Sequence, residues 1–338
     1  MKKKFIINFF IILVVLILVL YFSLKDNYRE IINYISNINL FWLFVSITIL
    51  LLYRVIVGLC SYKVVLINNA NVNFGKMVQI NFIIPFFHGI TPFSGGGQPM
   101  EIYYLHNEGV SKTKSTNIVL QNFILYQIAL IVVSLLAVIC NQIFELFPKD
   151  DFMRRLVLLG FLINFLALLI SLVAGFYKKL TSYIVKKIIT FLNKIKIIKD
   201  VDGTLNKFNN YIDNFYNNAN LLKKNKKQVC YVILLHMISL ILLYSIPYTI
   251  ILGMGLKDIN YIYILIATTY VMIIGSFVPI PGGTGGIEYG FMYFCGLIIS
   301  GSVLTAVMLM WRFITYYLAM IIGAIFLMMY RKKVKKCE

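Results

Sequence analysis

Two short stretches rich in glycine and proline interrupt a chain that is otherwise a succession of apolar runs. They are residues 91–101 (TPFSGGGQPME) and 278–288 (VPIPGGTGGIE), and a gapless alignment shares a proline, two adjacent glycines and a final glutamate. Irregular backbone is tolerated at membrane depth only where protein or a water-filled cavity surrounds it. The two stretches therefore predict broken helices at matching positions, a pattern typical of the substrate site in transporters built from inverted repeats.

The composition places the chain in a membrane. Of its 338 residues 60% are hydrophobic, and the mean hydropathy is +0.84, which excludes an ordinary soluble domain. The net charge of +19 falls mainly in the segments that flank apolar runs, where attraction to anionic lipids accounts for it. We therefore predict no nucleic-acid binding. The five cysteines are scattered without a CxxC pair, so we predict no disulfide framework, no metal and no cofactor.

Six apolar runs approach the ~20 residues that a helix needs to cross a bilayer. The first follows three lysines and has no small-residue cleavage site, so we expect an uncleaved helix. Two further apolar regions, about 77–105 and 261–300, contain the glycine-rich breaks. The fold class expected is an all-α integral membrane protein. The predicted spans are about 5–22, 40–59, 117–139, 156–175, 229–252 and 302–330.

The distribution of basic residues predicts the orientation. With the N-terminus in the cytoplasm, 24 Lys and Arg lie inside and six outside, as the positive-inside rule requires. Both broken regions must then be re-entrant hairpins that enter from opposite faces, which gives a 3+3 inverted repeat of about 1–139 and 156–330. Full spans at 261–279 or 286–300 are the alternative, but both segments are short, and either one alone would put the basic C-terminus outside. Abundant Lys, Asn, Ile and Tyr suggest a bacterium, hence its inner membrane with both termini cytoplasmic.

The chain divides into a first membrane repeat (1–175), a basic cytoplasmic linker (176–228) and a second repeat (229–338). Within 178–199 five apolar residues recur at helical spacing with lysines between them, which predicts an amphipathic helix on anionic inner-leaflet lipids. The alternative is a solvated basic connector. The apolar positions are Leu180, Ile184, Ile188, Leu192 and Ile195.

Glu101 and Glu288 close the two breaks and are the sharpest candidates for a substrate site, because a carboxylate is costly at membrane depth. Each break also opens a half-helix, whose backbone amides suit a lipid phosphate. The alternative is that the glutamates only cap the half-helices and the glycines only permit close packing. The glycines expected to bind an anion are Gly95, Gly96, Gly97, Gly282, Gly283, Gly285 and Gly286.

Arg54 and Arg312 lie inside predicted spans, where a guanidinium must find an anion. They either recognise a phosphate or form structural ion pairs with the two glutamates, and a pair opened by substrate would satisfy both interpretations. Gln98 and Thr284 join the predicted substrate site because they lie within the breaks. Other polar groups are expected to form hydrogen bonds inside the protein. These are His88, Gln121, Asn122, Gln127 and His236.

The paired breaks, Pro92 to Pro99 with Glu101 and Val278 to Glu288, resemble the transmembrane-region family of lysylphosphatidylglycerol synthases, the membrane part of the multiple peptide resistance factor. The resemblance covers nearly the whole chain. It implies a membrane part that moves aminoacylated phosphatidylglycerol to the outer leaflet. The sequence given ends soon after the last span, so the resemblance implies a stand-alone member without the cytosolic synthase domain. Two re-entrant hairpins are also similar, in architecture alone, to the DedA group of lipid transporters.

A lipid flippase or scramblase is therefore the predicted function. The alternatives are a phosphatidylglycerol lysyltransferase-type enzyme or a membrane subunit of one, and a lipid-binding scaffold. No P-loop, HExxH or GxSxG motif occurs, so the residues favour a transporter over an enzyme. A separately encoded synthase and a homodimeric partner remain open.

Overall fold

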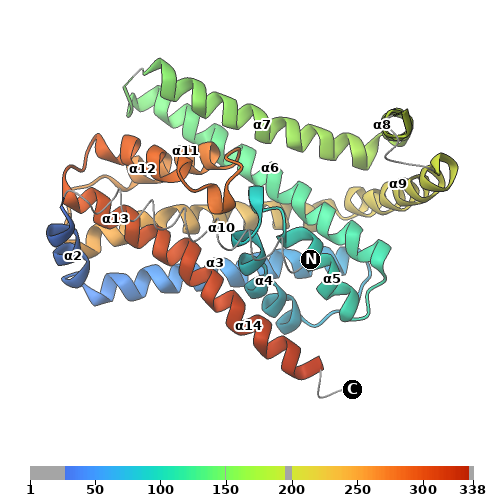
Figure 1. Ribbon diagram of the computed structural model, residues 1–338, viewed down its shortest axis with the longest axis horizontal. Coiled ribbons are helices and arrows are strands. Elements are labelled where there is room, and N and C mark those ends of the chain that lie inside the picture. Colours follow the sequence, from blue (N-terminus) through green and yellow to red (C-terminus); the bar gives the residue numbers. More distant parts are fainter. Residues whose placement is uncertain (1–26, 149, 195–199, 335–338) are drawn as a thin grey trace.

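The computed structural model describes residues 27–334 except Lys149 and residues 195–199. Within these residues every regular element is a helix (Figure 1). Five helices are long and apolar enough to cross a membrane, and they confirm the predicted spans from residue 40 onward. The first predicted span, 5–22, lies outside the described residues. The five are α3 (Leu40–Ile67), α6 (Lys112–Phe144), α7 (Asp151–Phe176), α10 (Lys226–Gly253) and a continuous helix, Ser302–Val334, made of α13 (Ser302–Arg312), the π-helical segment η3 (Phe313–Leu318) and α14 (Ala319–Val334).

Each glycine-rich break forms the tip of a helical hairpin. Hairpin 1 consists of α4 (Phe74–Gly89), η1 (Pro92–Ser94) and α5 (Gly97–Asn107), and hairpin 2 of α11 (Tyr261–Gly275), η2 (Pro281–Gly283) and α12 (Gly286–Gly296). The two helices of each hairpin pack against each other, and the tips η1 and η2 are in contact. Every hairpin helix is shorter than the ~20 residues of a full span, so the two hairpins meet within the helical bundle.

The antiparallel pair of α3 and α10 supports both hairpins, because α3 packs on α4 of hairpin 1 and α10 packs on α11 of hairpin 2. The amide of Asn39, just before α3, donates to the carbonyl of Gly253 at the end of α10 over 2.8 Å. At the opposite end, the thiol of Cys60 approaches the carbonyl of Val232. The final helix packs along hairpin 1, where Phe82 stacks on Phe326, and α6 packs along α11 of hairpin 2.

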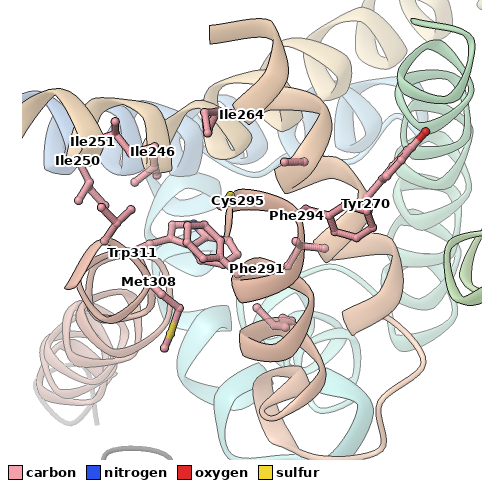
Figure 2. Packing of buried hydrophobic residues seen from close by; sticks show 14 of the residues in the cluster. Ile246, Ile250, Ile251, Ile264, Tyr270, Phe291, Phe294, Cys295, Met308 and Trp311 are labelled. Carbon is pink, nitrogen blue, oxygen red and sulfur yellow. The ribbon is translucent and has the colours of Figure 1, made fainter. Parts of the chain in front are cut away.

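The largest hydrophobic cluster surrounds hairpin 2 (Figure 2). Its centre is the stacked pair of Phe291 on α12 and Trp311 on α13, with ring centroids 4.9 Å apart. Isoleucines of α10 and α11 close over this pair. Helices in lipid are held by close van der Waals contact and internal hydrogen bonds, because lipid tails are as apolar as the side chains. The dense packing therefore fixes α12 against α13.

Three further helices lie at the periphery. They are α2 (Tyr28–Ser36), which contacts α13, and α8 (Lys178–Lys194) with α9 (Val201–Lys224), which contact each other and α7. Helix α8 corresponds to the amphipathic helix predicted within 178–199, as far as the described residues extend.

Candidate functional site

Glu288 in hairpin 2 forms a buried ion pair. It is the third residue of α12, and its Oε2 accepts the amide of Gly285 over 2.6 Å, which caps the helix. Its Oε1 lies 2.7 Å from Nε of Arg312 on α13. The two residues are only 8% and 6% exposed. The two alternatives to a substrate role, a helix cap and a structural ion pair, therefore both occur at Glu288.

Arg312 also holds the tip of hairpin 2. Its Nη2 donates to the carbonyl of Gly282 over 3.1 Å and to the hydroxyl of Thr284 over 3.2 Å. The Thr284 hydroxyl in turn donates to the carbonyl of Pro281 over 2.8 Å. A single guanidinium thus ties the irregular backbone of the tip to the last long helix, which supplies donors that the broken helix cannot provide itself.

Tyr316, which sequence reasoning missed, joins the two hairpins. It lies in η3, and its ring faces the Arg312 guanidinium with Cζ 4.7 Å from the centroid. A Cβ added to Gly282 would lie 2.3 Å from this ring, so only glycine fits there. The Tyr316 hydroxyl donates to the carbonyl of Gly89 in hairpin 1 over 2.9 Å. In the sequence, the role of Tyr316 was indicated only by its position four residues after Arg312, on the same helix face. The structure adds that it lies in a π-helical segment, and such segments often occur at functional sites.

Glu101 in hairpin 1 has a different environment although its motif position is the same. Its Oε1 accepts the hydroxyl of Ser61 on α3 over 3.1 Å, and the residue is 8% exposed. Among the described residues no cationic group forms an ion pair with it. Helix α5 begins at Gly97, the counterpart of Thr284, whereas α12 begins two residues later in the alignment at Gly286. Glu101 therefore lies beyond the first turn and points to α3 instead of capping its own helix.

A hydrogen-bonded chain leads from Glu101 into the interior. The amide of Asn122 on α6 donates to Ser61 Oγ over 3.1 Å, and its Oδ1 lies 3.1 Å from Nε2 of His236 on α10. The Nδ1 atom of His236 is buried without a partner among the described residues. Asn122 and His236 thus take the hydrogen-bonding role expected for them. Ser61 was missed because the predicted span ended at residue 59, while α3 continues to Ile67.

Arg54 lies on α3 seven residues before Ser61. Its guanidinium stacks on the ring of Tyr53, with Cζ 4.9 Å from the centroid. Its Nε is buried without a hydrogen-bond partner among the described residues, and no carboxylate there forms an ion pair with it. The arrangement does not pair Arg54 with Glu101, so α3 and hairpin 1 hold a guanidinium and a carboxyl that do not form an ion pair with each other.

The two tips use different residues for their turns. Tip 2 has positive φ at Gly282, Gly283 and Gly285, whereas tip 1 has it at Phe93 and Ser94. In tip 1, His88 Nδ1 bonds to the carbonyl of Ser94, and the imidazole leaves no room for a Cβ at Gly97. The remaining predicted positions lie on tip 1: the amide of Gly96 donates to the Thr91 hydroxyl over 2.9 Å, Gly95 is exposed, and Gln98 is half-buried in the first turn of α5.

The glycine-rich tips therefore differ in the backbone amides that they leave for an anion. The Gly285 amide is taken by Glu288, whereas no side-chain carboxylate caps the start of α5. Within the described parts of the chain, no three His, Cys, Asp or Glu side chains converge as they would around a metal ion. Binding of an anion at the glycines stays a prediction.

Comparison with known proteins identifies the family. The model of the lysylphosphatidylglycerol synthase transmembrane region matches residues 6–323. A UPF0104 membrane protein from Archaeoglobus fulgidus is 23% identical over 281 residues, which cover 75% of this chain and 76% of that protein. The chain therefore belongs to the lysylphosphatidylglycerol synthase transmembrane-region family, a membrane protein family linked to lipid handling. It is a multi-pass membrane protein, as predicted.

Proposed function

We propose that this member of the lysylphosphatidylglycerol synthase transmembrane-region family moves a phospholipid between the two leaflets of its membrane, as a flippase or scramblase. The observation that carries the proposal is the pair of broken hairpins that meet at their tips, one with a buried ion pair and the other with a buried carboxyl that has no cationic partner among the described residues. Charged groups within membrane segments are costly and mark substrate or ion pathways.

The pattern of helix contacts supports a 3+3 inverted repeat. Helices α3 and α4 correspond to α10 and α11, since each long helix packs against the first helix of the hairpin that follows it. Likewise α5 packs on α6 as α12 packs on α13. Each hairpin is also covered by the closing helix of the other half, α14 on α4 and α6 on α11. Two such halves, rocking about their contact, are the usual machinery of alternating access.

Hairpin 1 offers the substrate site in this proposal. Arg54 and Ser61 are seven residues apart, so they lie on one face of α3 about 10 Å apart along its axis. A lipid phosphate on Arg54 would leave a headgroup amine near Glu101, which is bonded to Ser61. Ethanolamine places only two carbons between phosphate oxygen and amine, whereas an aminoacyl group on phosphatidylglycerol places a longer chain there. The spacing favours aminoacylated phosphatidylglycerol as substrate.

In this proposal hairpin 2 does not bind the headgroup and instead keeps the two hairpin tips together. The Glu288–Arg312 pair and the Tyr316 contacts hold its tip against hairpin 1. Opening of the Glu288–Arg312 pair would release the tip. Transport would be passive or coupled to protons, and the carboxyl of Glu101 is the group placed to carry one. Both termini would face the cytoplasm of the bacterium.

The proposal is tested by measuring the rate at which fluorescent phosphatidylglycerol and lysylphosphatidylglycerol move between leaflets of liposomes that contain the purified protein. We expect movement with the unaltered protein and at least about a tenfold loss when Glu101→Gln and Glu288→Gln are combined, since one lost charge-assisted contact of about 1.5–3 kcal/mol corresponds to that factor or more. The matched control is Asp151→Asn, an exposed carboxylate in the first turn of α7. Full activity of the double variant would refute the site, and absence of movement with the unaltered protein would favour a lipid-modifying role.

A further inference from the structure

Helix α8 lies crosswise to the long helices at one end of the bundle. Figure 1 shows α8 nearly end-on beside the end of α7, while α6 and α7 run across the view. Helix α8 follows α7 after a single residue, Tyr177, and packs on α7 and α9. A helix in this position lies along a membrane surface if the long helices cross the bilayer.

One face of α8 is satisfied by protein contacts. Ile189 is 2% exposed and is the buried residue of this helix. Lys178, at the first position, forms an ion pair of 2.7 Å with Asp213 on α9. This face fixes how α8 is rotated, and therefore which residues point away from the bundle.

A second face is apolar and exposed. Its residues are spaced by four, four and three positions, so they form one stripe along the helix. Between 42% and 62% of each of them is accessible. The stripe consists of Leu180, Ile184, Ile188 and Phe191.

Lysines follow the stripe along one side. Four of the five lysines of α8 make no ion pair among the described residues, and the helix contains no acidic residue. Lys187 bends over the ring of Tyr183, with Nζ 4.9 Å from the centroid, so it lies close to the stripe. Basic residues beside an apolar stripe are the pattern by which a helix binds anionic lipid. The four are Lys179, Lys186, Lys187 and Lys194.

We propose that α8 is a lipid-binding site, with its stripe among the acyl chains of one leaflet and its lysines on anionic headgroups. The exposed apolar surface of α7, which includes Leu166 and Ile170, continues through Tyr177 onto α8, and this continuity favours lipid over a protein partner. The site rests on the membrane location of the chain and does not depend on lipid transport. It places the α8 end of the bundle at the leaflet that carries the anionic lipids.

The test uses the full chain in nanodiscs and two neighbouring tryptophan variants. Phe191→Trp puts the probe on the stripe, whereas Thr190→Trp puts it about 100° around the helix, on an exposed position away from the stripe. Brominated phospholipid quenches tryptophan that touches acyl chains. After subtraction of the unaltered protein, we expect at least about twofold stronger quenching for Phe191→Trp, because that side chain enters the acyl region. Equal quenching of the two probes would overturn the proposal. Blue-shifted but unquenched Phe191→Trp emission would also overturn it, because it would show a protein covering the stripe.

A second arm tests the choice of anionic lipid. Brominated phosphatidylglycerol is added as a minor component to phosphatidylcholine, and brominated phosphatidylcholine is used at the same fraction for comparison. The Phe191→Trp protein should be quenched more by the anionic lipid. Replacement of the four lysines by glutamine should remove this preference and leave the quenching by phosphatidylcholine unchanged. Lys178 is kept because it pairs with Asp213. A preference that survives the four replacements would refute the role of the lysines.

Discussion

The two hairpins carry a glutamate at the same motif position but surround it with opposite electrostatics. In hairpin 2, Glu288 is bonded to Arg312 and to the amide of Gly285. In hairpin 1, the one hydrogen bond that Glu101 accepts from a side chain of the described residues comes from the hydroxyl of Ser61. The difference arises because α5 begins two residues earlier in its motif than α12 does. A small shift in where a helix begins thus turns a structural cap into a side chain that faces the interior of the bundle.

The contrast between the two hairpins predicts its largest effect for the two arginines, whose replacement should change the free energy of unfolding by different amounts. Arg312→Met leaves Glu288 buried without its partner, which costs about 3–5 kcal/mol for a buried pair. Arg54→Met removes a guanidinium that has no carboxylate partner among the described residues, so it leaves no partner unpaired and we expect a much smaller loss. Reversible unfolding of both variants in SDS–detergent mixtures measures the free energies.

A double variant that removes both charges of the hairpin 2 ion pair tests the contrast further. Adding Glu288→Gln to Arg312→Met should recover part of the lost stability, because no unpaired charge then remains buried. Equal losses for Arg312→Met and Arg54→Met would contradict the contrast between the hairpins.

The next largest effect is expected at a pair of aligned glycines. Gly282 has φ +67°, and a Cβ there would lie 2.3 Å from the Tyr316 ring. Its counterpart Gly95 has φ −79°, and the nearest atom to an added Cβ is 3.6 Å away. We expect Gly282→Ala to cost about 1–3 kcal/mol and Gly95→Ala less than about 0.5 kcal/mol. The same unfolding assay compares them, and a larger loss for Gly95→Ala would show that tip 1 is the more constrained of the two.

A smaller effect is expected from the hydrogen bond that joins the hairpins. Tyr316→Phe keeps the ring against Gly282 but removes the donor to the carbonyl of Gly89. Such bonds contribute about 0.6 kcal/mol on average inside membrane proteins. Tyr317→Phe is the matched control, because its hydroxyl has no hydrogen-bond partner among the described residues. Hydrogen exchange at the tip of hairpin 1 should rise for Tyr316→Phe and stay unchanged for the control, whereas equal exchange would remove Tyr316 from the link.

The sequence allowed prediction of the parts that depend on local pattern. Five apolar runs predicted five helices, and the two glycine-rich breaks predicted the hairpin tips. Both predictions were possible because a membrane span requires a run of apolar residues and an irregular backbone requires glycine and proline. An ion pair with a glutamate was one of the two interpretations of Arg312, beside recognition of a phosphate, and Arg312 forms such a pair with Glu288. The first predicted span, 5–22, lies outside the described residues, and the inverted repeat stays a proposal.

Contacts between helices that are distant in the sequence could not be predicted from local residue patterns. Ser61 and Tyr316 are ordinary residues in sequence, and their roles depend on Glu101 and Gly89 reaching them from other helices. The gapless alignment also made the two glutamates look equivalent. Helix α5 begins where the His88 imidazole bonds to Ser94 and packs on Gly97, and this contact could be seen only in three dimensions.

The most direct test compares single variants of hairpin 1 in the liposome assay with two lipids. If Arg54 holds the phosphate and Glu101 the amine, Arg54→Gln should slow both phosphatidylglycerol and lysylphosphatidylglycerol. Glu101→Gln should slow lysylphosphatidylglycerol by about tenfold or more and leave phosphatidylglycerol nearly unchanged. Unaltered discrimination between the two lipids in Glu101→Gln would contradict the account that hairpin 1 binds the headgroup.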